Sequence, residues 1–332
     1  INPMQYGTIV HYILERFFGE YTKEEYLSLE EDKFQKIVCA YLAEYAVKYF
    51  GEEQLESNSF TYRLKTILDN VMYLMKHIME ELSQSEFFVA DCELKIGEDI
   101  PSYTIVLPDG HKIAVCGSVD RVDIMQRADI TYLRIIDYKT GTKQFKLSDI
   151  LYGINLQMLL YLHSIEASGG DKYGEIVPAG ILYMPATVPY ISSDSLKSID
   201  KLPDELNKKL KMNGLLLKDT EIIHGMDKTD AATYIPVKIK AGEPVSSTSL
   251  ATLAEFGKIF KKVDMLIAEM GKNIYNGNIE AKPLKGGHDS CEYCPYDSVC
   301  AYRQSNPITC FSVDNKTVIE EITNEINGKE EE

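Results

Sequence analysis

Residues 117–123 read GSVDRVD, and residues 135–141 read IIDYKTG. These stretches belong to two apolar, β-branched runs, 112–125 and 130–138, which are separated only by the polar residues 126–129. Two such runs on either side of a short polar turn predict a pair of antiparallel strands. We therefore expect Asp120 and Asp137 to lie on neighbouring strands of one sheet.

The second stretch places a carboxylate and an amine on one face of its strand. Asp137 and Lys139 are two residues apart, and side chains alternate across a strand. A carboxylate is a hard oxygen ligand for Mg²⁺ or Mn²⁺, and a lysine beside it can orient an attacking water or neutralise charge on a phosphate. Asp120 would give the same ion a second carboxylate. The alternative is a surface ion pair, which a D-x-K pattern alone would favour.

Two other charged residues of the first stretch are predicted to lie outside the metal shell. Asp123 is three residues from Asp120, so strand alternation places it on the opposite face of the sheet. Arg121 also points away from Asp120, and we expect it to form a structural ion pair.

Polar residues at helical spacing follow downstream. The apolar periodicity predicts one helix over 147–167. Gln157 and Tyr161 are four residues apart and share a face of it, from which both could reach a phosphate or a metal-bound water.

The residues named above occur in a fixed order and follow an upstream histidine: Gly7-x3-His11, Asp120, Asp137-Tyr138-Lys139 and Gln157-x3-Tyr161. This order resembles the RecB-family branch of the PD-(D/E)XK nucleases, and within it the AddB-type nuclease domains of AddAB helicase–nucleases. The resemblance runs from the first helix to the cysteines near residue 300. It implies an α/β (α+β) fold with a restriction-endonuclease-like αβββαβ core, a mixed sheet, an N-terminal helical layer and a C-terminal Cys-rich loop. Periodicity alone predicts only a mixed α/β fold with a helical N-terminal layer.

The resemblance also assigns roles to residues. It implies that His11 completes a Mg²⁺ or Mn²⁺ site with Asp120 and Asp137, although an ordinary helical histidine is the alternative. Lys139 would position or activate the water, while Gln157 and Tyr161 would steady the phosphate. Glu93 lies on the strand predicted over 87–96, where an exposed glutamate and an active-site role remain equally open.

The activity that the resemblance implies is metal-dependent DNA exonuclease action. Such a domain would trim the 5′-ended strand during double-strand-break repair by homologous recombination, with an AddA-like partner subunit, DNA as substrate and a cytoplasmic location. The alternative is a non-catalytic nuclease-fold scaffold or DNA-end-binding module. Loss of activity usually removes the lysine or an acid, and this sequence retains all of them.

We expect one nuclease domain over 1–314. It divides into a helical layer (1–86), a catalytic core (87–186), an insertion (187–246), and a helix with the cysteine cluster (247–314). Residues 315–332 are predicted to form an acidic, disordered tail.

The 332 residues carry a net charge of −16, from 35 basic and 51 acidic side chains. This charge argues against tight DNA binding by the chain alone and predicts strong dependence on divalent metal. No apolar run of about 18 residues occurs, so no membrane span is expected. The start, Ile1-Asn2-Pro3, has no initiator Met or leader, and we interpret the chain as a fragment of a longer polypeptide. The lysines at 208, 209 and 211 favour a solvated face over contact with a phosphate backbone.

Four of the seven cysteines lie close together, as Cys291-x2-Cys294-x5-Cys300 with Cys310 beyond. This spacing predicts a metal or cluster site, and zinc could add Cys310 or His288 as its fourth ligand. The resemblance instead implies a 4Fe-4S cluster completed by a cysteine before Gly7. No cysteine precedes Cys39, so we expect the cluster to be absent, incomplete or completed by Cys310 in this chain.

Overall fold

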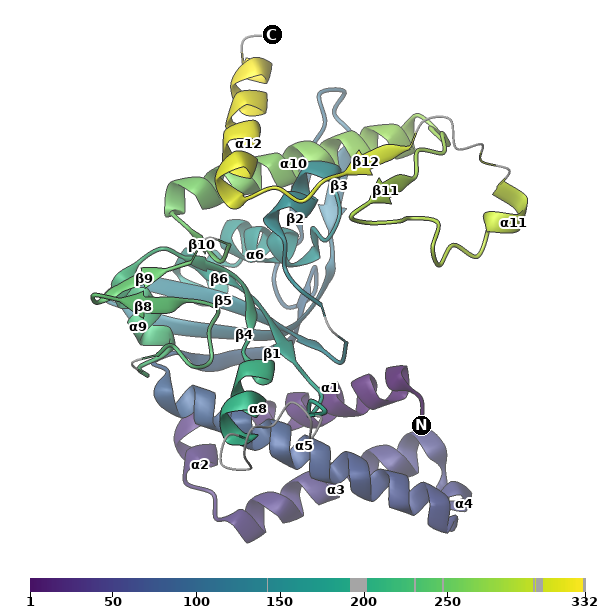
Figure 1. Cartoon of the computed structure of the whole chain (residues 1–332), viewed down its shortest axis with the longest axis vertical. Helices are drawn as coiled ribbons and strands as arrows, with labels where there is room; N and C mark the ends of the chain where they lie inside the picture. The colour runs from purple at the N-terminus through teal and green to yellow at the C-terminus, as the bar shows by residue number, and fades with distance from the viewer. Residues whose placement is uncertain are drawn as a thin grey trace.

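The computed structural model describes residues 1–141, 143–191, 202–229, 231–246, 248–300, 302 and 307–330. A mixed sheet lies at its centre, with the helices of the first 84 residues on one side and α6 (Gln157–Ser168), α10 (Leu253–Tyr275) and α12 (Asn315–Glu330) on the other (Figure 1). Among the described helices, none combines the length and the apolar character needed to cross a membrane.

The described residues form a central sheet of six strands in the order β1-β4-β5-β6-β7-β10. β1 pairs with β4 and β4 with β5 in antiparallel fashion, β6 lies parallel to β5, and β7 lies antiparallel to β6. The strands are β1 (Phe88–Ile96), β4 (Gly117–Arg127), β5 (Ile130–Lys139), β6 (Glu175–Pro185), β7 (Asn213–Leu217) and β10 (Leu250–Ala251). The predicted antiparallel pair and the αβββαβ order are thus confirmed.

Five helices form the N-terminal layer: α1 (Pro3–Glu20), α2 (Lys23–Leu27), α3 (Glu31–Phe50), α4 (Glu52–Leu55) and α5 (Asn58–Gln84). α1 begins where Asn2 and Gln5 form a capping box and proline occupies the first turn. Its apolar stripe, which includes Ile9, Ile13 and Phe17, is fully buried. Since α1 packs on β1, its polar residues near the sheet edge reach the strands.

The opposite face is covered by α6 (Gln157–Ser168) and α10 (Leu253–Tyr275), with the short α7 (Gly170–Tyr173) leading into β6. The prediction of one helix over 147–167 was wrong. A 3₁₀ helix, η1 (Leu147–Tyr152), is separated from α6 by Gly153 and Asn155, which have φ of 68° and 54°. Left-handed backbone cannot continue a right-handed helix, so the apolar stripe divides there.

The strand predicted over 112–125 is also divided, at Cys116. Its first part, β3 (Lys112–Val115), pairs with β2 (Tyr103–Val106) in an antiparallel hairpin, while the second part is β4 of the main sheet. The hairpin packs against α10 and α6.

The segment predicted as an insertion is partly a component of the sheet. β7 pairs with β6, and residues 214–217 of β7 are buried. The segment also contains α8 (Leu202–Leu210), α9 (Thr220–Met226), β8 (Lys238–Lys240) and β9 (Glu243–Val245). Residues 192–195, which the same prediction covers, lie outside the described residues.

The C-terminal part contains β11 (Leu284–Gly286), α11 (Asp297–Cys300) and β12 (Ile308–Cys310), followed by α12 (Asn315–Glu330). The expected disordered tail was therefore wrong over 315–330. Val318, Ile322 and Ile326 recur every fourth residue, and this stripe is buried because α12 packs on α10 and η1.

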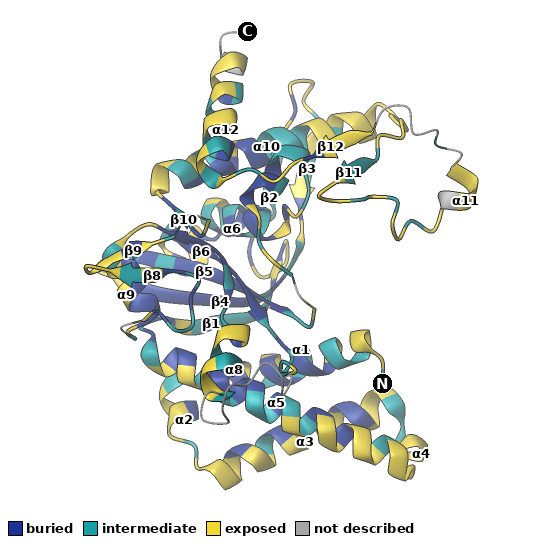
Figure 2. Cartoon of the chain, in the orientation of Figure 1, coloured by how far each residue is buried: buried dark blue, intermediate teal, exposed yellow. Residues whose placement is uncertain are grey.

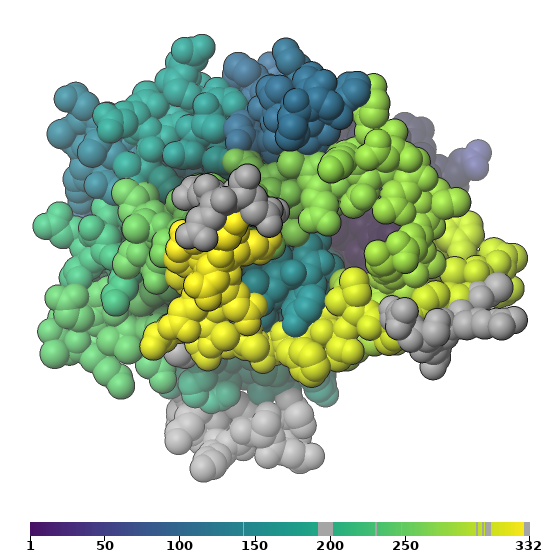
Figure 3. All heavy atoms as spheres, turned by 90° about the horizontal axis from the view of Figure 1, so that it is seen from above, coloured from purple at the N-terminus to yellow at the C-terminus, as the bar shows by residue number. Residues whose placement is uncertain are grey.

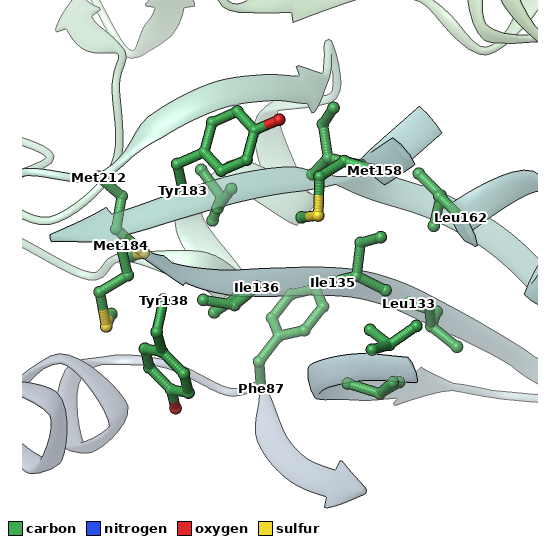
Figure 4. Packing of buried hydrophobic residues seen from close by; sticks show 14 of the residues in the cluster. Phe87, Leu133, Ile135, Ile136, Tyr138, Met158, Leu162, Tyr183, Met184 and Met212 are labelled. Carbon is green, nitrogen blue, oxygen red and sulfur yellow. The ribbon is translucent and has the colours of Figure 1, made fainter. Parts of the chain in front are cut away.

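Buried side chains fill both faces of the sheet, while the outer faces of the helices are exposed (Figure 2). Figure 4 shows Met158 and Tyr183 on one side of β5 and β6, with Phe87 and Tyr138 on the other. Side chains of β5 alternate between the two faces of the sheet, and each face carries its own group of polar residues.

Candidate metal centre

Three side chains from three elements converge at one edge of the sheet. His11 Nδ1 of α1 lies 3.3 Å from Glu93 Oε1 of β1 and 3.7 Å from Asp120 Oδ2 of β4. One ligand atom from each residue lies within 4.8 Å of the others. In the described parts of the chain, no other three His, Cys, Asp or Glu side chains come this close together.

Glu93 and Asp120 face each other across the β1–β4 pair. The neighbouring pairs Cys92–Arg121 and Leu94–Val119 set this register. Glu93 itself has φ of 50°, a conformation that costs a residue with a Cβ roughly 1–2 kcal/mol. Strain of this kind is concentrated at functional sites, where neighbouring contacts hold it.

Asp137 and Lys139 lie beside this group. The Tyr138 backbone N–H donates to Asp120 Oδ2 at 2.8 Å, so the Asp120 carboxylate lies against β5. Asp137 forms an ion pair with Lys139, as the spacing predicted. Asp137 Oδ2, the oxygen that Lys139 Nζ contacts, is buried and accepts no hydrogen bond of standard geometry from the described residues.

The three convergent groups influence one another's pKa values. Burial raises the pKa of Asp120 to about 6, the charge of His11 opposes the shift, and Asp137 adds to it. Burial alone would lower the pKa of His11, but the hydrogen bond with Glu93 and the charge of Asp120 raise it above its usual value. The hydrogen bond with His11 holds the pKa of Glu93 below its usual value. A divalent cation would favour the deprotonated form of all three.

Gln157 and Tyr161 occupy different surroundings from one another. Gln157 is exposed at the start of α6, and no hydrogen bond among the described residues joins it to the acids. Tyr161 packs on the first residue of β4, where a Cβ built on Gly117 would lie 2.2 Å from the Tyr161 hydroxyl. Only glycine permits this approach, which brings the phenol to the strand that carries Asp120.

Asp123 and Arg121 lie on the other face of the sheet, as the alternation predicted. Asp123 accepts two hydrogen bonds from Arg121, each at 2.7 Å, and one from Arg134 at 3.0 Å. Glu81 of α5 accepts from both arginines, and all four side chains are fully buried. This network fastens the N-terminal layer to the sheet behind the candidate centre.

A pocket of about 650 Å³ opens beside His11 and Glu93. Tyr12, Tyr45 and Tyr49 line it from α1 and α3. The candidate centre is therefore reachable from solvent.

The three lysines of residues 208–211 have local partners. Lys208 pairs with Glu205, and Lys209 and Lys211 donate to the backbone carbonyls of Tyr190 and Ala232. Lys208 and Lys209 are exposed, as expected of a solvated face, whereas Lys211 is half-buried.

The cysteines do not converge. Cys291 and Cys294 are joined by a backbone turn, Cys300 is exposed at the end of α11, and Cys310 is buried on β12. Because no three of these thiols come together among the described residues, their arrangement here does not fit a zinc ion or a 4Fe-4S cluster.

Glu93 is the residue that sequence reasoning left undecided and the geometry brings to the centre. Asp137, in contrast, was expected in the metal shell and lies beside the three-residue group with Lys139. The signal for Glu93 was its position on the strand that pairs with β4, since the antiparallel register puts it opposite Asp120.

The chain is similar in sequence to a nuclease family and to several bacterial proteins. A family described as "PD-(D/E)XK nuclease superfamily" matches residues 1–301. A protein of Thermoanaerobacter sp. (strain X514), named as a subunit of an ATP-dependent helicase/deoxyribonuclease, is 34% identical over 313 residues, which cover 91% of this chain and 27% of that protein. Proteins of the same name from Alkaliphilus oremlandii and Clostridium kluyveri are 32% and 34% identical, with 98% of this chain and 29% of each relative covered. The chain thus spans under a third of the length of these relatives.

Proposed function

Because the chain belongs to the PD-(D/E)XK nuclease superfamily, we propose that it hydrolyses phosphodiester bonds of DNA with a divalent cation. The observation that carries this proposal is the convergence of His11, Glu93 and Asp120 beside the Asp137–Lys139 pair. If Asp137 and Lys139 formed only a surface ion pair, the convergence of three further potential metal ligands beside them would have no explanation.

The donor set fits Mg²⁺ or Mn²⁺. Carboxylate oxygens suit both ions, and an imidazole is more readily accepted by Mn²⁺. His11, Asp120 and Asp137 remain the proposed ligands, and Glu93 joins them. A bound cation would polarise the phosphate and lower the pKa of a bound water.

The chain's own residues would do the rest. Lys139 has a half-buried ammonium beside Asp137, from which it can orient the attacking water or offset charge on the phosphate. Tyr161 can hold the strand near Asp120, and Gln157 can donate to a phosphate oxygen from the exposed start of α6. The products would be a 5′-phosphate and a 3′-hydroxyl.

We further propose that the domain acts as the nuclease part of a helicase–nuclease, as the names of its relatives indicate for those proteins. It would be an exonuclease on the 5′-ended strand, fed by an AddA-like subunit, in recombinational repair of double-strand breaks in the cytoplasm. A strand delivered by a motor would need little affinity from the nuclease, which agrees with the net charge of −16.

The 4Fe-4S cluster remains a prediction from the family resemblance. Anaerobic addition of iron and sulfide should give bound iron and visible absorption in the wild type and in Cys39→Ser, but not in Cys291→Ser. No uptake by the wild type would mean that the cluster is absent from this chain, and loss of uptake in Cys310→Ser would identify Cys310 as the fourth ligand.

The nuclease proposal is tested with linear single-stranded DNA labelled separately at its 5′ and 3′ ends. The wild type should cut it with Mg²⁺ or Mn²⁺, and chelation should stop the reaction. Lys139→Ala and Asp137→Ala should each abolish cutting, whereas Asp129→Ala, in the exposed turn between β4 and β5, should not. The order in which the labels are released gives the polarity.

Calorimetric titration with Mn²⁺ separates failure of chemistry from failure of binding. The wild type should bind the ion, and Asp120→Ala should not. Neither cutting nor binding by the wild type would overturn the proposal and favour the non-catalytic scaffold.

A further inference from the structure

We propose that a lysine-lined pocket next to Lys139, which we call the Lys143 pocket, binds a backbone phosphate of DNA adjacent to the one that is cut. The pocket is lined by Lys143, Gln144, Lys146, Asp149, Ile154, Asn155, Gly287 and His288. The inference rests on the proposed hydrolysis, and it assigns a substrate-binding subsite to residues outside the metal centre.

The Lys143 pocket has a volume of about 440 Å³ and lies between the segment after β5 and the turn after β11. Segments distant in sequence therefore form its two walls. Figure 3 shows the surface hollowed beside the yellow-green C-terminal loop, with purple atoms of the N-terminal helices visible at its base. An extended strand could enter the Lys143 pocket, whose lining is mostly polar.

The two lysines of this pocket have no acidic partner in an ion pair among the residues that the structure describes. No ion pair within the described parts of the chain involves Lys143 or Lys146, whereas Lys139, Lys172 and Lys262 each pair with a carboxylate. Asp149 is the one acid in the lining, and its Oδ2 already accepts from Asn155 Nδ2 at 2.6 Å. Two lysines against one acid give this depression a positive balance of charge in a chain whose net charge is −16, which favours an anionic ligand.

Lys143 is tied spatially to the proposed chemistry. Its Nζ lies 5.0 Å from the centre of the Tyr183 ring, and Lys139 Nζ lies 5.8 Å from the same ring. Tyr183 is the register partner of Asp137 in β6. Burial lowers the pKa of the Lys143 amine, and the charge of Lys139 lowers it further. A phosphate beside both ammoniums would relieve this repulsion.

The backbone that carries Lys143 is held in place by β7. Asn213 Oδ1 accepts from the Phe145 N–H at 2.7 Å, and Asn213 Nδ2 donates to the Lys143 carbonyl at 3.1 Å. One amide thus fixes both sides of Gln144. Because this segment is already held in place, binding of a phosphate would cost less conformational entropy. A lysine loop that is merely solvated would have no need of such contacts.

The first test compares salt dependence of DNA binding. In Ca²⁺, with the DNA verified to be intact, the double variant Lys143→Gln/Lys146→Gln should bind single-stranded DNA about tenfold more weakly than the wild type. The slope of log affinity against log salt should fall by roughly 0.7 for each phosphate contact that is lost. Lys33→Gln/Lys36→Gln, which removes the same charge from the exposed start of α3, should leave the slope unchanged.

The second test locates the phosphate. A single neutral methylphosphonate is placed in turn at each position next to the cut site. At one position the methylphosphonate should weaken DNA binding by the wild type. At that position it should not further weaken DNA binding by the double variant. Folding of the variant is verified by its unchanged Mn²⁺ affinity.

Equal slopes in the wild type and the double variant, or equal sensitivity to every methylphosphonate, would overturn the subsite. A wild type that binds DNA but cannot cut it would instead count against the proposed function, while the salt slopes would still decide the subsite.

Discussion

Glu93 has a left-handed backbone conformation and lies beside two other candidate metal ligands. Its carboxylate serves the candidate site, whereas its backbone conformation lowers the stability of the fold. Its carboxylate contacts His11 and accepts from the Ser118 hydroxyl at 2.9 Å. Its φ of 50° would suit glycine better. The site therefore retains a strained residue for its side chain.

Replacement of Glu93 by Gly and by Ala tests this interpretation. Both variants should lose Mn²⁺ affinity because both lack the carboxylate. Without metal, Glu93→Gly should exceed Glu93→Ala in free energy of unfolding by about 1 kcal/mol, because only glycine adopts positive φ without cost. Urea unfolding measures the difference. As a control, at exposed Thr104 of β2 the glycine variant should have a lower free energy of unfolding than the alanine variant. The same order at position 93 would show that the backbone of Glu93 is not strained.

At the scale of elements, the buried network of Glu81, Arg121, Asp123 and Arg134 joins α5 to β4 and β5. Arg134 Nη1 has no hydrogen-bond partner among the described residues, so this guanidinium depends on Asp123 and Glu81. The contacts with both arginines overcome the burial that would raise the pKa of Asp123, and hold that pKa below its usual value.

Asp123→Asn should lower the free energy of unfolding by about 3–5 kcal/mol, because it leaves a buried arginine charge uncompensated. Urea unfolding is again the measurement. The matched control is Glu98→Gln, which removes the exposed partner of Lys95 and should cost less than about 1 kcal/mol. A loss at Asp123 as small as at Glu98 would show that the network does not stabilise the fold.

A second polar contact joins α6, α10 and the β2–β3 hairpin. His163 Nε2 lies 3.2 Å from Asp264 and 3.2 Å from the Tyr103 hydroxyl, and its Nδ1 lies 3.3 Å from Glu166. Burial alone would lower the pKa of His163, but the hydrogen bonds and charges of Asp264 and Glu166 raise it to about 9.

This raised pKa makes stability dependent on pH in a defined window. The unfolded histidine has a pKa of about 6.5, so the contribution is complete below pH 6.5 and is lost as the pH rises through about 9. We expect a loss of about 2 kcal/mol across that window, since the partners are partly solvated. His163→Gln should flatten the profile measured by urea unfolding from pH 6 to 9.5, and an unchanged slope would contradict the assignment.

At the scale of the whole molecule, each layer contributes a different part of the proposed site. The N-terminal layer supplies His11, the sheet supplies the acids and Lys139, and α6 supplies Tyr161. The C-terminal part forms one wall of the Lys143 pocket and packs on η1 through α12. Stability of the last helix should therefore affect the whole chain.

Ile322→Ala in α12 should lower the free energy of unfolding by about 2–5 kcal/mol, because Ile322 is fully buried. Lys316→Ala, on the exposed face of the same helix, should change it by less than about 0.5 kcal/mol. Thermal and urea unfolding provide the comparison. Two equally mild effects would mean that residues 315–330 are not part of the cooperative unit.

The sequence alone determined the local pattern. Alternation predicted that Asp137 and Lys139 share a face and that Asp123 lies opposite, and the strands predicted over 87–96 and 130–138 agree with β1 and β5 to within one residue. These features depend on spacing along the chain, and the spacing of side chains is nearly constant in regular structure.

Only the tertiary structure decided which distant groups meet. The antiparallel register placed Glu93 against Asp120, packing of α1 on β1 placed His11 there, and Asn213 of β7 fixed the segment of Lys143. Left-handed residues divided the helix predicted over 147–167, and contact with α10 ordered the supposed tail. Register, strain and long-range burial are properties of the assembled core, so the spacing of residues along one chain does not determine them.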